Sequence, residues 1–310
     1  MQKILITGSN GLLGQKLVYK LKKNPNIQCI ATARGLNRLV KTDGYIFTEL
    51  DITRLENVIQ VFTSYKPDVV INTAAMTNVD ACETEKEACW LLNVTAVQNQ
   101  IDVLEKLQKE NSNYKPQFIH LSTDFIFDGS HGPLDENEIP NPQSYYAESK
   151  LEAEKIVQAS HLHWAIARTV LVYGIVDNMS RSNIVLWVKQ NLEQGKEINV
   201  VDDQYRTPTL AEDLADGCLL IAEKKAQGIY HISGKDFLNI LELAQLVADY
   251  YNLDKSLIKP SKSADIKQPA KRPPITGFII NKAKKELGYN PMSFIEGIKF
   301  LEKQINELNK

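Results

Sequence analysis

The sequence predicts an α/β protein in which a doubly wound parallel sheet is followed by a smaller C-terminal lobe. Over residues 1–174, short apolar runs alternate with helical segments, which is the pattern of successive βαβ units. A glycine-rich loop at residues 8–14 follows the first apolar run, and a Tyr and a Lys lie four positions apart at residues 146–150. Ligands bind to such sheets outside the carboxyl ends of the strands, so we expect both features at that edge.

The composition is that of an ordinary globular enzyme. Of the 310 residues, 43% are hydrophobic and 24% are charged, and the net charge is −2, which gives no electrostatic reason to expect nucleic acid or an anionic membrane as a partner. The N-terminus enters an apolar run at once and has no signal-peptide pattern. No apolar run reaches the ~18 residues that span a bilayer. We therefore expect a cytoplasmic protein.

The four cysteines do not predict a metal site. Cys29, Cys82, Cys89 and Cys218 form no C-x-x-C pair, and none has a histidine at metal-ligand spacing. We expect the thiols to be reduced and packed or half-buried, and we expect no bound metal.

The glycine-rich loop GSNGLLG at residues 8–14 indicates a phosphate ligand. It lies between an apolar run and an amphipathic segment. Glycines let the backbone approach a pyrophosphate, and the free N–H groups at the start of the helix face the anion. Strand, glycine loop and helix together predict a Rossmann fold. The spacing is G-x-x-G-x-x-G rather than G-x-G-x-x-G, and a tight turn without a ligand is the alternative.

Arg34 marks the expected cofactor as NADP. It follows the second predicted strand, about twenty residues past the last loop glycine, where dinucleotide-binding folds place the residue that contacts the ribose. An acidic residue there favours a free 2′-hydroxyl, whereas an arginine favours a 2′-phosphate through charge-assisted hydrogen bonds. Arg38 and Lys41 are close enough to help. We expect NADPH, with NADH possible; a solvated basic patch is the alternative.

The strands of the predicted sheet are near-continuous apolar runs, which indicate burial on both faces. Small or polar residues follow several of them, among them Asp51-Ile52, Ala74-Ala75 and Ser122-Thr123-Asp124. Because these residues all follow strand ends, we expect them at one edge of the sheet. Strands are predicted at residues 3–7, 27–32, 45–50, 68–73, 117–122 and 164–170, and helices at residues 13–22, 89–109 and 146–159.

Tyr146 and Lys150 predict an acid–base pair. Residues four apart lie one above the other on a helical face. An unperturbed tyrosine has a pKa of about 10, and a neighbouring ammonium lowers that value, which makes the phenol a usable general acid–base group. Tyr-x-x-x-Lys also occurs by chance in many helices. The interpretation therefore depends on the glycine loop and on the Ser-Thr-Asp at residues 122–124.

Beyond residue 174 the alternation of strands and helices becomes less regular. We expect residues 1–174 to form the NADP-binding domain, with residues 208–233 returning to it, and residues 175–310 to form mainly a substrate-binding lobe. In this half the sequence predicts helices at 183–194, 209–224, 239–251 and 281–287, a final amphipathic helix, strands at 199–201 and 228–233, and a turn at 204–209.

Together these residues resemble the extended short-chain dehydrogenase/reductases, and within them the dTDP-4-dehydrorhamnose reductase family. The glycine loop and Tyr-x-x-x-Lys mark the superfamily, whereas STDFIFDG and VDACE are more specific to the reductases. The resemblance implies NADPH-dependent reduction of a 4-keto-6-deoxy sugar nucleotide, as in dTDP-L-rhamnose biosynthesis, by a monomer or homodimer. The matching segments are ITGSNGLLG, NTAAMTNVDACE, LNVTA, LSTDFIFDG, YYAESK, RTVLVYG, DDQYRTPT, IYHISG and KRPPITGFI.

The resemblance also implies a role for each matching residue. Tyr146 is the expected acid, Lys150 its pKa modulator and ribose ligand, and Thr123 the hydroxyl that polarises the substrate carbonyl. Asn93 is expected to support the lysine through water, and Asp124 to contact the substrate beside Thr123 and Tyr146. The cofactor is expected to contact Gly8, Asn10, Gly11, Leu12, Leu13, Gly14, Arg34, Asp51, Ile52, Ala74, Ala75, Tyr146 and Lys150.

Two arginines in matching segments receive different roles, one in substrate binding and one in structure. Arg206 lies in QYRTPT, where the family usually has a small residue such as glycine, in a predicted turn before Pro208. An arginine there suits bidentate pairing with a diphosphate or a sugar carboxylate of the substrate, and an exposed turn arginine is the alternative. Arg168 is expected to be structural, because a strand arginine at a domain junction more often anchors a carboxylate or a carbonyl.

Two other functions remain open. A sugar-nucleotide epimerase or dehydratase would retain NAD tightly, although Thr123 is followed by Asp-Phe rather than by the Asp-Glu pair that the dehydratases use. A regulatory subunit of methionine adenosyltransferase also resembles this family and binds a partner protein. The intact set of Thr123, Tyr146 and Lys150 favours the enzyme.

Overall fold

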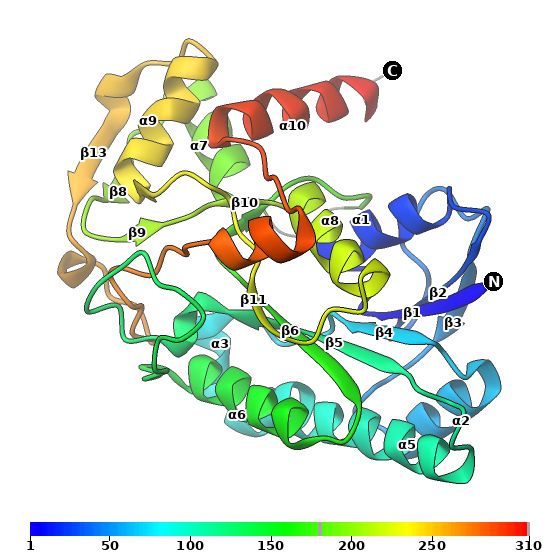
Figure 1. Cartoon of the computed structure of the whole chain (residues 1–310). Coiled ribbons are helices and arrows are strands. Elements are labelled where there is room, and N and C mark those ends of the chain that lie inside the picture. Colours follow the sequence, from blue (N-terminus) through cyan, green and yellow to red (C-terminus); the bar gives the residue numbers. More distant parts are fainter. Residues whose placement is uncertain (179–181, 309–310) are drawn as a thin grey trace.

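A computed structural model describes residues 1–178 and 182–308. Its centre is a seven-stranded sheet in the order β11-β6-β5-β4-β1-β2-β3, in which all neighbouring strands pair in parallel (Figure 1). The chain proceeds outward from β1 in both directions, which confirms the predicted doubly wound Rossmann fold. The strands are β1 (Gln2–Thr7), β2 (Ile27–Ala33), β3 (Ile46–Glu49), β4 (Val69–Asn72), β5 (Gln117–Thr123), β6 (His163–Thr169) and β11 (Gly228–His231).

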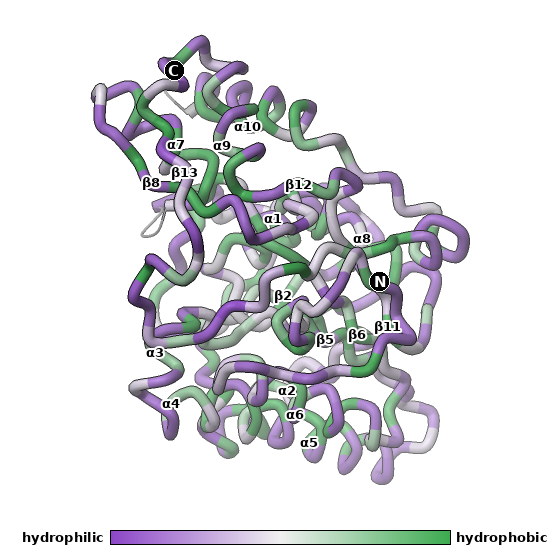
Figure 2. Tube along the Cα trace, turned by 90° about the vertical axis from the view of Figure 1, so that its left-hand side faces the viewer, coloured by the Kyte–Doolittle hydropathy of each residue, from purple (hydrophilic) through white to green (hydrophobic). Residues whose placement is uncertain are grey.

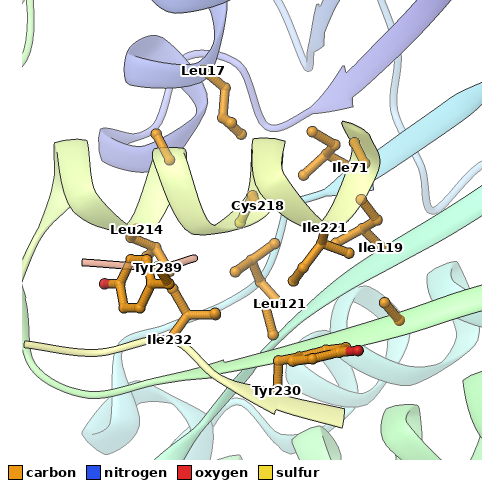
Figure 3. Packing of buried hydrophobic residues seen from close by; sticks show 14 of the residues in the cluster. Leu17, Ile71, Ile119, Leu121, Leu214, Cys218, Ile221, Tyr230, Ile232 and Tyr289 are labelled. Atoms are coloured by element: carbon orange, nitrogen blue, oxygen red, sulfur yellow. The ribbon is translucent and has the colours of Figure 1, made fainter. Parts of the chain in front are cut away.

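Helices cover both faces of the sheet. The helices α2 (Leu55–Tyr65), α5 (Ala96–Glu110) and α6 (Tyr145–Ala159) lie together on one face, at the bottom of Figure 1. The other face is covered by α1 (Leu12–Leu21) and α8 (Ala211–Glu223). Figure 3 shows how α8 packs, with Cys218 and Ile221 facing Leu121 and Ile119 of β5 and with Leu214 beside Tyr289 and Ile232.

The hydrophobic pattern follows these layers. The middle strands carry buried aliphatic side chains on both faces, and one large apolar cluster fills each interface between sheet and helices. In Figure 2 the chain is mostly apolar along the inner strands and more polar along its outer turns. All four cysteines are free and buried, as the sequence predicts. Among the described residues, no helix is long and apolar enough to cross a membrane.

The C-terminal lobe has its own core, formed mainly by the helices α7 (Ile184–Glu193), α9 (Ile240–Tyr250) and α10 (Phe294–Leu308). Short strand pairs also occur in this half of the chain, and two of them include strands from the segment 204–209, where the sequence predicts only a turn. The elements of this half are β7 (Val172–Tyr173), α7 (Ile184–Glu193), β8 (Ile198–Val201), β9 (Tyr205–Arg206), β10 (Thr209–Leu210), β12 (Leu238–Asn239), α9 (Ile240–Tyr250), η3 (Lys255–Leu257), β13 (Ile258–Ser261), η4 (Ser263–Asp265), η5 (Ala283–Leu287) and α10 (Phe294–Leu308).

The structure differs from the sequence-based prediction most before β5. Helix α2 has no counterpart among the predicted elements. The predicted helix at 89–109 is interrupted by a π-helical turn, η1 (Leu91–Thr95), which separates α4 (Lys86–Trp90) from α5. Single π-turns inside helices occur frequently at functional sites, and this one contains Asn93. Two short helices complete the chain, α3 (Val79–Thr84) and the 3₁₀ turn η2 (Asp124–Ile126).

Candidate active site

The glycine loop joins β1 to α1 in close contact with the end of β4. Gly8 has a φ of +70°, a conformation that favours glycine, and a Cβ there would lie 2.9 Å from the backbone of Ala74. A Cβ on Gly14 would lie 2.3 Å from the Gly8 carbonyl oxygen. Helix α1 begins after Gly11, which offers no side chain to cap it. The first-turn N–H groups at Leu12 and Leu13 therefore have no capping side chain, which is the arrangement that dinucleotide-binding folds offer to a pyrophosphate.

We predict that two alanine substitutions in this loop have different effects. Gly14→Ala should lower the free energy of unfolding by about 1–3 kcal/mol, because its Cβ overlaps rigid backbone. The Cβ of Gly11→Ala would lie 3.3 Å from the nearest heavy atom, the Gly8 oxygen, which is a much milder contact, so that variant should lose clearly less stability than Gly14→Ala. It should instead weaken NADPH binding about tenfold, because the added methyl group would hold the pyrophosphate away from the backbone N–H groups of the loop, at a cost similar to that of one charge-assisted hydrogen bond. Thermal unfolding and NADPH titration of both variants test this, and a Gly14→Ala protein as stable as wild type would contradict it.

The loop after β2 carries the basic side chains predicted to bind the 2′-phosphate. Arg34 directly follows β2, and its side chain and that of Arg38 are exposed. Residues 34–38, together with Asn178, line an open pocket. Asn10 holds this loop to the glycine loop, because its side chain donates to Leu36 O at 2.9 Å and accepts from Arg38 N at 2.9 Å. The structure thus places a cationic pocket beside the glycine loop.

The remaining predicted cofactor residues lie near strand ends, in different environments. Ala74 is half-buried beyond β4, and its N–H donates to Thr7 Oγ1 at 3.3 Å. Ala75 follows it and is also half-buried. Asp51, beyond β3, accepts from the N–H and hydroxyl of Thr53 at 3.0 and 2.6 Å. The side chain of Ile52 packs in the core and is 4% exposed, so any contact of this residue with a cofactor would come largely from its backbone.

Tyr146 lies in the first turn of α6, which is fixed by two caps. Ser144 accepts a hydrogen bond from Ala147 N at 3.3 Å, and Glu83 accepts one from Tyr145 N at 2.7 Å. The Tyr146 ring packs edge-on against Phe125 with centroids 6.1 Å apart. These contacts leave the side chain of Tyr146 8% exposed and determine where its ring lies.

Thr123 ends β5 next to Tyr146. Its hydroxyl donates to Asp124 Oδ1 at 3.1 Å and accepts from Phe125 N at 3.2 Å. Burial raises the pKa of Tyr146 above its usual value, and a hydrogen bond with Thr123 opposes this rise. The phenol therefore keeps its proton at neutral pH. That is the form required of a general acid in a reduction.

Lys150 does not have the electrostatic effect predicted for it. Its Nζ donates to Leu121 O at 2.6 Å and lies 3.1 Å from His120 Nε2, so it contacts β5. The pKa of Tyr146 is raised rather than lowered. Burial lowers the pKa of Lys150 itself to about 8, and the nearby Glu154 carboxylate opposes that shift. Desolvation has a larger effect on both groups than the ammonium–phenol interaction that the sequence suggests.

Asn93, within the π-helical turn, links α6 to the loop after β4. Its amide nitrogen donates to Ser149 Oγ at 3.0 Å and to Met76 O at 3.1 Å, while its oxygen accepts from Met76 N at 2.7 Å. Ser149 directly precedes Lys150. The structure thus places Asn93 where it fixes the helix that carries the lysine, and its predicted support through water stays a prediction.

Arg168 is structural, which confirms the prediction. Its Nε and Nη2 donate to the two carboxylate oxygens of Glu154 at 2.9 and 2.7 Å. The side chains are 3% and 0% exposed. Glu154 lies one helical turn after Lys150, so this buried ion pair anchors helix α6 to β6.

The placement of Arg206 corrects the prediction of a turn arginine that faces the substrate or the solvent. It lies in β9 and is 3% exposed. Nη1 donates to the carbonyls of Tyr205 and Pro274 at 2.7 and 3.0 Å, and Nη2 donates to the carbonyl of Pro273 at 2.7 Å. These contacts with the protein satisfy the donors that a substrate phosphate would need.

Asp124, predicted to contact the substrate, is also buried, at 2% exposure. Oδ2 lies 3.7 Å from Arg206 Nε and accepts a hydrogen bond from Thr276. Burial raises the pKa of Asp124, and the Arg206 charge and the Thr276 hydroxyl oppose that rise. Asp124 and Arg206 therefore form an ion pair beneath the site, through which β9 and the segment around Thr276 are held to the end of β5.

The sequence-based prediction did not include His120 and Asn72, both of which are buried. His120 Nε2 lies 3.1 Å from Lys150 Nζ, and Asn72 Nδ2 lies 3.1 Å from His120 Nδ1. Each is the one polar residue in a short apolar run, FIHL in β5 and VVIN in β4, and that isolation is the signal that marks them. Among the described residues, no group of three or more His, Cys, Asp or Glu side chains is arranged to hold a metal ion.

Known proteins resemble this chain over most of its length. The family model described as the RmlD substrate binding domain matches residues 1–306. Methionine adenosyltransferase 2 subunit beta of Xenopus tropicalis is 32% identical over 264 residues, which cover 84% of this chain and 75% of that protein. The dTDP-4-dehydrorhamnose reductase of Aggregatibacter actinomycetemcomitans is 30% identical over 311 residues, which cover 96% of this chain and 98% of that protein.

A solved structure has the same fold. It is a dTDP-4-dehydrorhamnose reductase from Bacillus anthracis in complex with NADP. It matches with a TM-score of 0.82 and 26% identity, and the match covers 98% of this chain and 100% of that one. The similarity thus includes both the sheet and the C-terminal lobe. The chain belongs to the RmlD substrate binding domain family, within the extended short-chain dehydrogenase/reductases, and dTDP-4-dehydrorhamnose reductases are among its relatives.

Proposed function

We propose that this protein is an NADPH-dependent reductase that converts the 4-keto group of a 6-deoxy sugar nucleotide into a hydroxyl group. The observation that carries the proposal is the placement of Thr123 and Tyr146 together. They come from the end of β5 and the start of α6, at the same sheet edge as the glycine loop and the Arg34 pocket. A carbonyl held there would meet a hydroxyl donor and a protonated phenol.

In the proposed reaction, NADPH supplies the hydride to the carbonyl carbon. The Thr123 hydroxyl, which donates to Asp124 Oδ1 in this structure, would turn its proton to the carbonyl oxygen and polarise it. Tyr146 would donate its proton to the same oxygen as negative charge develops. A positioned acid of this kind contributes ~10²–10⁴-fold in rate. Lys150, one helical turn after Tyr146, would be the source of the proton that restores the Tyr146 phenol. Asn93, Glu154 and Arg168 hold the helix that carries both residues, and Arg206 acts indirectly by fixing Asp124.

The direct test is turnover with candidate substrates. The purified protein should oxidise NADPH when a dTDP-linked 4-keto-6-deoxy sugar is added, and the product should carry a new hydroxyl group at C4 by NMR. A thermal-shift screen of sugar nucleotides with NADPH identifies the nucleotide and the sugar, because a ligand of the folded state raises the Tm. The proposal would be refuted if no 4-keto sugar nucleotide raises the Tm and none causes oxidation of NADPH.

We predict at least a tenfold preference for NADPH over NADH. The exposed Arg34 and Arg38 side chains can pair with a 2′-phosphate, and hydrogen bonds to charged groups are worth roughly 1.5–3 kcal/mol each. Arg34→Ala should abolish most of this preference, because it should lower kcat/KM for NADPH and leave kcat/KM for NADH unchanged. Arg54→Ala is the matched control, because Arg54 is an exposed arginine outside the pocket residues. Equal kcat/KM for the two cofactors in the wild type would contradict the assignment.

We also predict that the rate decreases at alkaline pH. The pKa of Lys150 is lowered to about 8 by burial. Below that pH the group is an ammonium that can return a proton, and above it the amine has no proton to return. The kcat/KM for the sugar nucleotide should therefore be constant on the acidic side and decrease about tenfold per pH unit on the alkaline side. If kcat/KM stays constant up to about two pH units above the Lys150 pKa of about 8, Lys150 is not the proton source.

A second candidate function is a non-catalytic regulatory subunit. The observation that favours it is the 32% identity to methionine adenosyltransferase 2 subunit beta. Size-exclusion chromatography of this protein mixed with a methionine adenosyltransferase catalytic subunit tests it. Co-elution without any turnover of sugar nucleotides would favour the regulatory function, and turnover without co-elution would favour the reductase.

A further inference from the structure

A row of buried polar side chains lies beneath the catalytic helix and has no part in the proposed mechanism. Thr7, Asn72 and His120 are register partners on the adjacent strands β1, β4 and β5. The contacts are Thr7 Oγ1 to Asn72 Oδ1 at 2.6 Å, Asn72 Nδ2 to His120 Nδ1 at 3.1 Å, and His120 Nε2 to Lys150 Nζ at 3.1 Å. All four side chains are at most 3% exposed. The row therefore connects the strand before the glycine loop to Lys150.

The donors in this row point in one direction. The Thr7 hydroxyl accepts from Ala74 N at 3.3 Å, so its own proton faces Asn72 Oδ1. Gln100 Nε2 also lies 3.4 Å from that oxygen. With two donors on its oxygen, Asn72 presents its N–H to His120 Nδ1. A neutral imidazole that accepts at Nδ1 carries its proton on Nε2.

The Nε2–H of His120 then points at Lys150. An ammonium has three donors and no acceptor, so it cannot accept this hydrogen bond, whereas a neutral amine can. The amine can still donate to Leu121 O at 2.6 Å. His120 is itself neutral, because burial and the adjacent Lys150 lower its pKa well below the usual value.

We propose that His120 is a positioning residue for Lys150 that donates its Nε2–H to Nζ and so stabilises the neutral amine. This inference rests on the proposed function in one respect, namely that Lys150 supplies a proton in the reaction. A group that gives and takes protons works best when both forms are accessible near the operating pH. His120 contributes to this balance by favouring the neutral form.

Two of the titratable groups around Lys150 favour its charged form, which is opposite to the effect proposed for His120. Glu154, on the same helix, favours the ammonium, although both of its oxygens also accept hydrogen bonds from Arg168 of β6. Cys89 of α4 favours the ammonium as well. Tyr146, one turn earlier on α6, is kept in its neutral form by burial. Loss of the His120 donor should therefore move Lys150 toward the charged form.

The first experiment determines the tautomer of His120 in the wild-type protein. The two tautomers of a neutral histidine differ in their imidazole ¹⁵N chemical shifts, so ¹⁵N NMR of the ring-labelled wild-type protein assigns the proton, with His120→Asn used to identify the resonance. We expect Nε2–H at a pH one unit above the Lys150 pKa of about 8. A proton on Nδ1 would overturn the proposal.

The second experiment compares His120→Asn with His231→Asn. Asparagine at position 120 keeps an amide near Asn72 but cannot reach Nζ. His231 is an equally buried histidine on β11 that contacts Leu134 O instead. In His120→Asn, the titration of Lys150, followed by ¹³C NMR of labelled lysine, should move to higher pH by roughly 0.5–1. The alkaline decrease of kcat/KM should move with it, whereas His231→Asn should change neither.

The outcomes separate this inference from the proposed function. A Lys150 titration in His120→Asn that is unchanged, or that moves to lower pH, would overturn the role of His120 even if the protein is an active reductase. The expected tautomer and titration shift in a protein without reductase activity would support the role of His120 and refute the proposed function.

Discussion

Tyr146→Phe is expected to lower kcat by about 10²-fold or more while leaving the fold and the Kd for NADPH unchanged. The phenylalanine ring keeps the edge-on contact with Phe125 and the packing in this small apolar cluster. The variant loses only the hydroxyl, which is the proposed proton donor. Steady-state kinetics with the sugar nucleotide, together with NADPH titration and thermal unfolding, separate chemistry from binding and stability.

Tyr145→Phe is the matched control for this experiment. Tyr145 is the preceding residue of the same helix, and its half-buried ring packs near Trp90 with centroids 6.1 Å apart. Removing its hydroxyl should leave kcat close to the wild-type value. If Tyr146→Phe retains activity within about threefold of wild type, Tyr146 is not the acid. Equal losses in both variants would point to a disturbed helix start rather than to a lost proton donor.

The sheet could be predicted from the sequence because its strands are buried on both faces. Runs such as KILIT and DVVINT have no polar alternation, and the residues that follow them lie at one edge of a parallel sheet for purely topological reasons. The positions of Thr123 and Tyr146 follow from the same rule, since β5 and α6 are consecutive elements of one βα unit. The structure brings these two side chains together at the predicted place.

The contacts that depend on distant segments could not be predicted. The buried position of Arg206 depends on the carbonyls of Pro273 and Pro274, which are 67 and 68 residues away in the sequence. The orientation of Lys150 depends on His120 and Leu121 O across the helix–sheet interface. Local spacing identifies which residues share a helical face, but it does not say whether burial or a neighbouring charge dominates their pKa values.

The buried Glu154–Arg168 pair gives the largest expected effect on stability. Arg168→Met should lower the free energy of unfolding by about 3–5 kcal/mol, because it leaves the Glu154 carboxylate buried without its partner. The midpoint of thermal unfolding should decrease by roughly 5–10 °C. Burial of the guanidinium is already costly, since Nη1 has no hydrogen-bond partner among residues 1–178 and 182–308. Differential scanning calorimetry measures the loss.

The double variant Glu154→Leu with Arg168→Met isolates the cause. Replacing both members of a buried ion pair with apolar side chains of similar size is often neutral or stabilising, so the double variant should recover most of the Tm that Arg168→Met loses. Its kcat/KM should begin to decrease at a lower pH than in the wild type, because Glu154 no longer favours the ammonium of Lys150. A double variant as unstable as Arg168→Met would mean that Arg168 stabilises the protein by packing and not by neutralising the buried carboxylate. One such packing contact is with Phe127, whose ring lies 5.3 Å from the guanidinium carbon.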